Sequence, residues 1–123
     1  MAATAALLLN HGTAFAAGDA AKGKSVFKRC AACHNIDNTK NKVGPHLSGI
    51  LNRKAGTVEG FNYSKSLMSK AAEGLVWDTA SLDKYLEKPK AFIPQGKMAF
   101  AGLANPADRA DLIAYLAEAG KAK

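Results

Sequence analysis

The sequence predicts an all-α fold in one small domain. Three segments place apolar residues at helical spacing and begin at a capping residue, whereas no run of alternating β-branched residues, the pattern typical of a strand, occurs. The chain has 123 residues, of which 48% are hydrophobic and 22% charged, an ordinary globular composition. This length excludes a doubly wound nucleotide-binding enzyme and a (β/α) barrel, which need far more chain.

The first helix is expected from about Asp19, which would be its N-cap, to Arg29. Its apolar face consists of Gly23, Val26 and Phe27. Residues 40–60 are rich in Gly, Asn and Lys and predict a loop, after which residues 64–72 predict a short helix.

The second main helix should start near Asp78 or Thr79 and end at about Lys88, because Pro89 disfavours helix in the residue before it. Its expected apolar face consists of Leu82, Tyr85 and Leu86.

The last helix has the clearest signals: Asn105 caps it, Pro106 fills its first turn and Gly120 closes it. Its apolar side consists of Leu112, Ile113, Tyr115 and Leu116.

The N-terminus has the pattern of an export signal. Residues 5–9 form a short apolar run, and Ala14-Phe15-Ala16 supplies the small-x-small pattern of a cleavage site. The run is much shorter than the ~20 residues that span a membrane. We therefore expect a signal peptide over residues 1–16 and a single mature domain over 17–123, located in the periplasm. Because no basic residue follows Met1, we expect the true start upstream; the alternative is a tail without a targeting role.

The only two cysteines lie in Cys30-Ala31-Ala32-Cys33-His34, the C-x-x-C-H motif of covalent heme attachment. Two thiols on one helical turn can add to the two vinyl groups of one porphyrin, and His34 would then be the proximal iron ligand. A redox-active disulfide and a zinc site are the alternatives, although zinc would need four ligands and only His11 and His46 remain as further histidines.

A second axial ligand must come from a distant part of the chain, and the candidates are Met98, Met68 and His46. Met98 is favoured because it lies in a loop bracketed by Pro94 and Gly102, whereas Met68 falls in the short helix and is expected to pack in the core. A His/Met pair raises the heme potential and leaves no open coordination position. This predicts an electron-transfer protein, not an enzyme.

Taken together, the residues from Gly18 to Lys121 resemble the class I c-type cytochromes, closest to mitochondrial cytochrome c and bacterial cytochrome c2. The resemblance is carried by the heme motif, Lys42-Val43-Gly44-Pro45, Gly60-Phe61-Asn62-Tyr63-Ser64, Tyr85-Leu86-Glu87-Lys88-Pro89-Lys90, Lys97-Met98-Ala99-Phe100-Ala101-Gly102 and Asp111-Leu112-Ile113-Ala114-Tyr115-Leu116. It implies the small cytochrome c fold, in which the N- and C-terminal helices cross and shorter helices and loops wrap around one covalently bound heme c.

The resemblance also implies a role for individual residues. Pro45 would offer its carbonyl to Nδ1 of His34, and Tyr85 would place its hydroxyl beside the Met98 sulfur. The heme propionates and the remaining heme environment would be served by Arg53 (through water), Tyr63, Ser64, Trp77 and Phe100. Gly23 and Phe27 would contact Leu112 and Tyr115 where the terminal helices cross.

Four positions depart from the family pattern, namely His46, Ser48, Leu67 and Gly96. Gly96 stands where a threonine commonly bonds a propionate, so we expect the Met98 loop to be somewhat looser than in relatives.

The chain carries a formal net charge of +7 but no run of five Lys or Arg residues, so nucleic acid is not an expected partner. Basic residues flank the segments expected around the exposed heme edge: Lys24, Lys28, Arg29, Lys42, Lys90 and Lys97. Residues 104–106 lack the lysines of mitochondrial relatives, so the basic patch would be lopsided. We expect a monomer that docks transiently on acidic sites of a quinol-oxidising complex and of a terminal oxidase or photosynthetic reaction centre.

Two other functions remain as alternatives. The first is a heme sensor or peroxidase-like protein in which Met98 is displaced, and the second is a dithiol oxidoreductase that uses Cys30 and Cys33.

Overall fold

The computed structural model describes residues 18–121 and confirms the all-α prediction. The helices in this part of the chain are α1 (Ala20–Phe27), α2 (Lys65–Ala72), α3 (Thr79–Glu87), α4 (Pro89–Phe92) and α5 (Pro106–Ala119). These residues contain no strand, only one isolated antiparallel bridge between Lys54 and Val76. None of the helices is long and apolar enough to cross a membrane. The predicted export signal, residues 1–16, lies outside the described residues.

Four helices begin at a side-chain cap, which is why the sequence located their starts. The side chain of the capping residue accepts a backbone N–H from the first turn in each case. The caps are Asp19 for α1, Ser64 for α2, Asp78 for α3 and Asn105 for α5. The prediction for the first helix was wrong at its end. The helix stops at Phe27, and the chain continues as tight turns through Cys33.

The short helix α4 was not predicted. Pro89 does end the preceding helix: Lys88, the residue before it, leaves the helical conformation with φ −147° and ψ 88°. The same proline then occupies the first position of α4, where its missing N–H has no intrahelical partner to lose. One residue therefore both stops α3 and starts α4.

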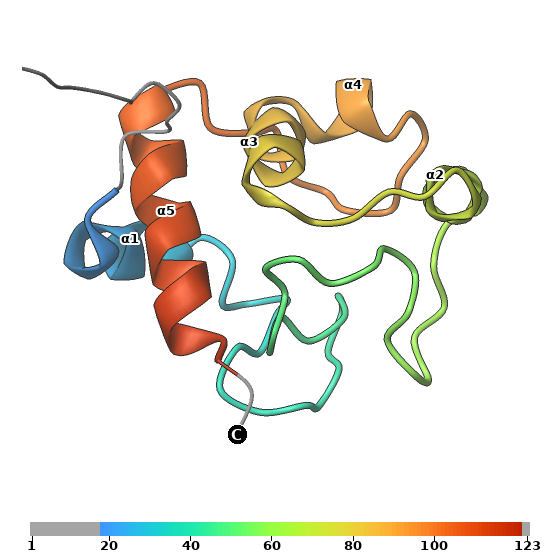
Figure 1. Cartoon of the computed structure of the whole chain (residues 1–123), viewed down its shortest axis with the longest axis horizontal. Coiled ribbons are helices and arrows are strands. Elements are labelled where there is room, and N and C mark those ends of the chain that lie inside the picture. The colour runs from blue at the N-terminus through green and yellow to red at the C-terminus, as the bar shows by residue number, and fades with distance from the viewer. Residues whose placement is uncertain (1–17, 122–123) are drawn as a thin grey trace, which may run out of the picture.

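The terminal helices cross as expected. Figure 1 shows α1 behind α5 at one end of the molecule, with α2 at the other end and α3 and α4 between them. Gly23 lies directly against the backbone of Asp111 and against Tyr115, and the rings of Phe27 and Tyr115 are 5.4 Å apart. Close approach of the two backbones is possible because Gly23 has no side chain.

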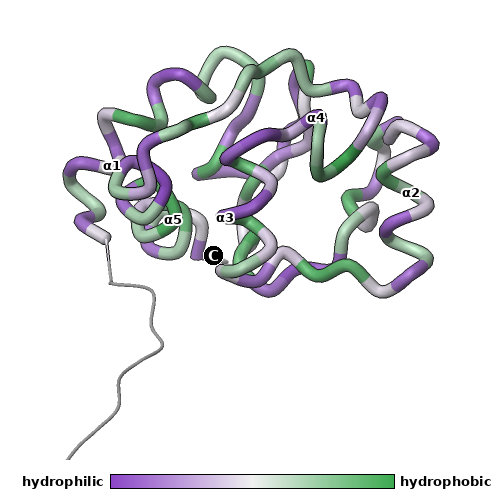
Figure 2. Tube along the Cα trace, turned by 90° about the horizontal axis from the view of Figure 1, so that it is seen from above, coloured by the Kyte–Doolittle hydropathy of each residue, from purple (hydrophilic) through white to green (hydrophobic). Residues whose placement is uncertain are grey.

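Helices and loops form a ring in the view from above, in which hydrophobic and hydrophilic stretches alternate along the trace (Figure 2). The core draws on α1, α3, α5 and the loops but not on α2, and its most buried members are Ile50, Ala55, Ile93, Leu103, Leu112 and Leu116. Residues 40–60 contain no helix, as predicted. Two backbone hydrogen bonds hold this loop against Trp77. The Asn52 N–H donates to the Trp77 carbonyl at 2.8 Å, and the Trp77 N–H donates to the Arg53 carbonyl at 2.9 Å.

The expectation that Met68 packs in the core was wrong. Its side chain is 44% exposed, and its sulfur lies against the backbone of Gly56. The reason is the position of α2, which contains no buried residue and lies at the edge of the molecule.

Candidate functional site

A central cavity of about 250 Å³ brings the predicted site together. Its walls are largely apolar, with side chains such as Leu47, Ile50, Leu82 and Leu112. Every residue predicted to attach, ligate or surround a cofactor also lines it: Cys30, Cys33, His34, Pro45, Arg53, Tyr63, Ser64, Trp77, Tyr85, Met98 and Phe100. These residues come from segments spread over most of the chain, so the fold, not local sequence, assembles the cavity.

The two cysteines lie on one turn directly after α1. The backbone N–H groups of Cys33 and His34 both donate to the Cys30 carbonyl, at 3.1 and 3.0 Å, so the turn is helical in pitch. Both thiols are free and partly buried. Burial raises the pKa of the Cys30 thiol, and the neighbouring Arg29 charge offsets only part of this effect. Two thiols at this spacing face one side of a turn and can reach one planar ligand edge.

The His34 imidazole is fixed from two directions. Its Nδ1 is 2.7 Å from the Pro45 carbonyl oxygen, which is the contact that the resemblance implied. Gly44 packs closely against the ring, so that a Cβ at this position would be only 2.8 Å from Nδ1. Burial lowers the pKa of His34, an effect that exceeds the opposing contribution of the Pro45 bond. A neutral ring with Nδ1 engaged leaves Nε2 available as a ligand.

Gly44 was not given a role from the sequence. The signal was present in Gly44-Pro45, but glycine before proline is also an ordinary turn pattern. Only the packing of the imidazole shows why a side chain is excluded there.

The Met98 sulfur is held beside a tyrosine hydroxyl. The Tyr85 hydroxyl donates to Sδ of Met98 at 3.6 Å, as the resemblance implied. Burial raises the pKa of Tyr85 to about 12, so this hydroxyl stays protonated in neutral solution. The Tyr85 ring packs on Trp77 and Phe92, with centroid distances of 5.0 and 6.1 Å. An aromatic cluster thus orients the group that contacts the sulfur.

Arg53 brings a guanidinium into the lining of the cavity. Its Nη1 donates to the carbonyl oxygens of His46 and Ser48 at 3.0 and 3.2 Å. Its Nε is buried and has no hydrogen-bond partner among the described residues. A buried guanidinium N–H without an acceptor is costly, so this atom is suited to an anionic group inside the cavity.

Two of the departures from the family pattern meet at this guanidinium. His46 and Ser48 contact Arg53 through their carbonyls, which any residue supplies. Their side chains are therefore not required for that contact. Leu67 and Gly96, the other two departures, both line the cavity.

The six predicted docking residues are all exposed, although they differ in their relation to the cavity. Arg29 and Lys97 line it, whereas Lys24, Lys28, Lys42 and Lys90 do not. The Arg29 guanidinium lies 5.2 Å from the centre of the Phe100 ring, in cation–π geometry. Three of the lysines donate to backbone carbonyls: Lys42 to Ala31, Lys90 to Gly96 and Lys97 to Asn62.

The zinc alternative finds no support in the described residues. No group of three or more His, Cys, Asp or Glu side chains within them is arranged to hold a metal ion. His46 lies near Arg53, and its pKa is lowered by burial and by that positive charge.

Comparison with known proteins agrees with the geometry. Residues 20–120 match the family Cytochrome c. The chain is 50% identical over 118 residues to cytochrome c2 of Rhodomicrobium vannielii, covering 95% of this chain and 92% of that protein. It is also 50% identical over 100 residues to cytochrome c2 of Agrobacterium tumefaciens, covering 80% and 90%.

A solved structure, cytochrome cH from Methylobacterium extorquens, superimposes with a TM-score of 0.75 at 43% identity. The match covers 82% of this chain and 99% of that one, so the cytochrome c fold predicted from the sequence is confirmed. The chain belongs to the cytochrome c family, as a class I c-type cytochrome, and is an electron-transfer protein, not an enzyme.

Proposed function

We propose that this cytochrome is a periplasmic one-electron carrier with one covalently bound heme c, ligated by His34 and Met98. The observation that carries the proposal is the convergence of one thiol pair, one oriented imidazole and one oriented thioether on the same cavity. When bound, heme supplies an iron that gains or loses a single electron.

The residues present fit a heme. Cys30 and Cys33 lie one turn apart, as two thioether bonds to one porphyrin require. The apolar walls suit a porphyrin face, and the unpartnered Nε of Arg53 suits a propionate. Tyr63, Ser64 and Trp77 line the same cavity and would complete the polar contacts, with Phe100 as part of the apolar wall.

The ligand pair decides between a carrier and a heme enzyme or sensor. A neutral imidazole and a neutral thioether would fill both axial positions, and the thioether favours ferrous iron and so raises the potential. The Tyr85 hydroxyl holds the Met98 sulfur, which argues against easy displacement by a gas or peroxide.

The dithiol alternative is disfavoured by the state of Cys30. A redox-active thiol needs a lowered pKa, whereas burial raises the pKa of Cys30. Attachment to heme needs no resting thiolate after the bonds have formed.

The exposed basic residues favour transient docking on acidic surfaces. Six exposed cations, of which Arg29 and Lys97 line the cavity, would speed association with a negatively charged partner and would be screened by salt. We propose that the partners are membrane redox complexes, namely a quinol-oxidising complex and a terminal oxidase or photosynthetic reaction centre. The carrier would act as a monomer.

The proposal is tested by absorption spectra of the protein produced with the heme-attachment machinery. The expected result is a reduced c-type spectrum and a weak far-red band in the ferric protein, and Met98→Ala removes that band. Met68→Ala is the matched control because its exposed sulfur lies outside the cavity, and the band should stay. A colourless protein with two titratable thiols would contradict heme attachment. A band that survives Met98→Ala would contradict the ligand assignment.

A further inference from the structure

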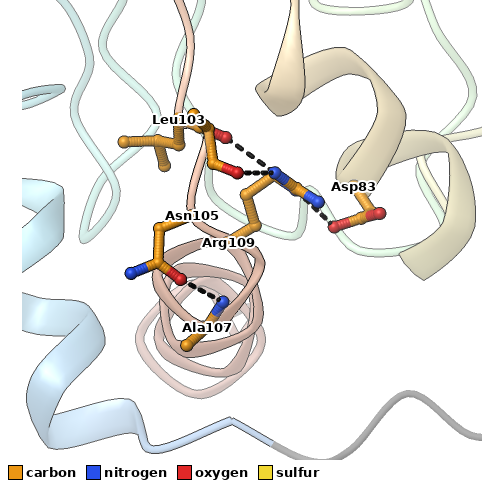
Figure 3. A network of polar contacts seen from close by, with 6 residues as sticks. Asp83, Leu103, Asn105, Ala107 and Arg109 are labelled. Atoms are coloured by element: carbon orange, nitrogen blue, oxygen red, sulfur yellow. Dashed lines mark hydrogen bonds and ion pairs between the residues drawn. The ribbon is translucent and has the colours of Figure 1, made fainter.

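Arg109 is the only charged side chain among the buried residues that the structure describes, and nothing in the sequence pattern gave it a role. It lies in the first turns of α5 with 7% of its surface exposed. Its Nε donates to Oδ1 of Asp83 at 2.7 Å, and its Nη1 donates to the carbonyls of Leu103 and Ala104 at 2.7 and 3.0 Å (Figure 3). One guanidinium therefore joins α5, α3 and the segment between them.

The segment that Arg109 holds is the end of the stretch that carries Met98. Leu103 is 2% exposed, and its N–H donates to the Leu86 carbonyl at 2.8 Å. Gly102 has a φ of +117° and lies against the Glu87 carbonyl, where a side chain would collide. The chain is thus fixed to the end of α3 only a few residues after Met98.

The remainder of that stretch has few bonds of its own. No backbone N–H of residues 97–102 donates to another backbone group of the described chain. At the N-terminal end of the stretch, the side chain of Lys90 donates to the Gly96 carbonyl and that of Lys97 to the Asn62 carbonyl, but both lysines are exposed. Water competes for the bonds of exposed lysines far more than for those of the buried Arg109 guanidinium. The Arg109 end is therefore the firmer of the two attachments.

We propose that the Asp83–Arg109 pair positions Met98 on the heme iron. Asp83 lies two residues before Tyr85 on α3, so the same helix anchors the guanidinium and presents the hydroxyl to the Met98 sulfur. Without the carboxylate, Arg109 would be a buried cation with no counter-charge, and its movement toward water would release the Leu103 and Ala104 carbonyls. This inference rests on the proposed ligation by Met98.

The test measures how easily an external ligand replaces Met98. The ferric holoprotein is titrated with imidazole at neutral pH, and loss of the far-red band reports displacement. Asp83→Asn should bind imidazole about tenfold more tightly than the unchanged protein, within the usual range of coupling between sites. Asp83→Glu keeps the charge and should restore most of the original affinity. Glu87→Gln is the matched control, because it removes an exposed carboxylate from the same helix and should leave the affinity unchanged.

Urea unfolding of the same variants distinguishes a purely structural role of the Asp83–Arg109 pair from a role in positioning Met98. If Asp83→Asn lowers global stability but binds imidazole like Glu87→Gln, the positioning role is overturned. Arg109→Lys provides a second variant, since lysine can pair with Asp83 but lacks the planar fork, and it should also weaken Met98 ligation. If the unchanged protein lacks the far-red band, or if Met98→Ala retains it, the proposed ligation by Met98 itself fails. If the band behaves as proposed but neither Asp83→Asn nor Arg109→Lys alters imidazole affinity, only the inference about Asp83 and Arg109 fails.

Discussion

The buried Tyr85 hydroxyl, which contacts the Met98 sulfur, makes the stability of the protein depend on pH. It lies 3.6 Å from Sδ, and its burial raises its pKa from an ordinary 10.0 to about 12. In the unfolded chain the same phenol ionises near its ordinary value. Between these two pKa values the unfolded state releases a proton that the folded state retains, so stability is complete below pH 10 and falls as pH rises toward 12.

Replacing Tyr85 by Phe should remove this dependence. One unit of pKa difference corresponds to about 1.4 kcal/mol, so the unchanged protein should lose about 1.4 kcal/mol between pH 9 and pH 11 through this group. Tyr85→Phe should lose correspondingly less, whatever its stability at pH 9. Free energies of unfolding from urea titrations at both pH values provide the measurement. Equal losses in the two proteins would show that Tyr85 does not cause the decline.

At the same scale, Arg53 shows what the sequence could not reveal. The resemblance suggested that Arg53 serves a propionate, but its contacts with the His46 and Ser48 carbonyls follow from the path of a loop. Backbone acceptors leave no pattern in a sequence, because every residue type supplies one. The buried, unpartnered Nε is likewise a property of the folded chain alone.

Among the elements, the crossing of α1 and α5 depends on the absence of one side chain. A Cβ on Gly23 would lie 2.6 Å from the Asp111 carbonyl carbon and 2.8 Å from Cβ of Tyr115. The obstacle is largely the backbone of α5, which cannot turn aside as a flexible side chain can. The crossing must therefore open if any larger residue occupies this position.

Gly23→Ala should consequently destabilise the protein. Alanine favours a helix by about 1 kcal/mol over glycine, but overpacking against backbone costs about 3 kcal/mol, so the expected net loss is about 2 kcal/mol. Ser25→Ala, at an exposed position of the same helix, should change stability by less than about 0.5 kcal/mol. Urea unfolding of both variants measures the difference. A Gly23→Ala protein as stable as the Ser25→Ala control would mean that the crossing tolerates a methyl group.

The helices also show how far local signals extend. The starts of α1, α2, α3 and α5 were predictable because a capping side chain bonds the first turn within a few residues. The helix α4 was missed because four residues carry no periodicity. Met68 was misplaced because an apolar residue in a helix is buried only when another element covers it, and the packing around α2 depends on distant segments.

At the scale of the whole molecule, apolar residues form the cofactor cavity and exposed charged residues form the predicted docking surface. Apolar walls surround the cavity, whereas the cations of the predicted docking surface stay in water. Of the six predicted docking cations, Arg29 and Lys97 line the cavity, so these two lie closest to the cofactor site. Long-range attraction between these cations and an acidic partner depends on where the charges lie and not on individual hydrogen bonds. The sequence could therefore indicate this surface before any contact was known.

Reversal of charge at Lys28 and Lys97 should therefore slow electron transfer with a negatively charged iron complex such as ferrocyanide. At low ionic strength the second-order rate constant of the double variant Lys28→Glu/Lys97→Glu should fall about tenfold, and the difference should shrink in 1 M salt, where the Debye length is about 3 Å. Lys121→Glu, at an exposed position beyond α5 that does not line the cavity, changes the net charge by the same amount as Lys28→Glu alone and is the matched control for that single variant. Because Lys97 also donates to the Asn62 carbonyl, the far-red band of each variant is recorded first, and Lys28→Glu alone reports the charge effect without that contact. Stopped-flow rates that fall equally in Lys28→Glu and Lys121→Glu would show that total charge governs the encounter. A loss in Lys28→Glu that exceeds the loss in Lys121→Glu, and that grows when Lys97→Glu is added, would place the docking surface beside the cavity.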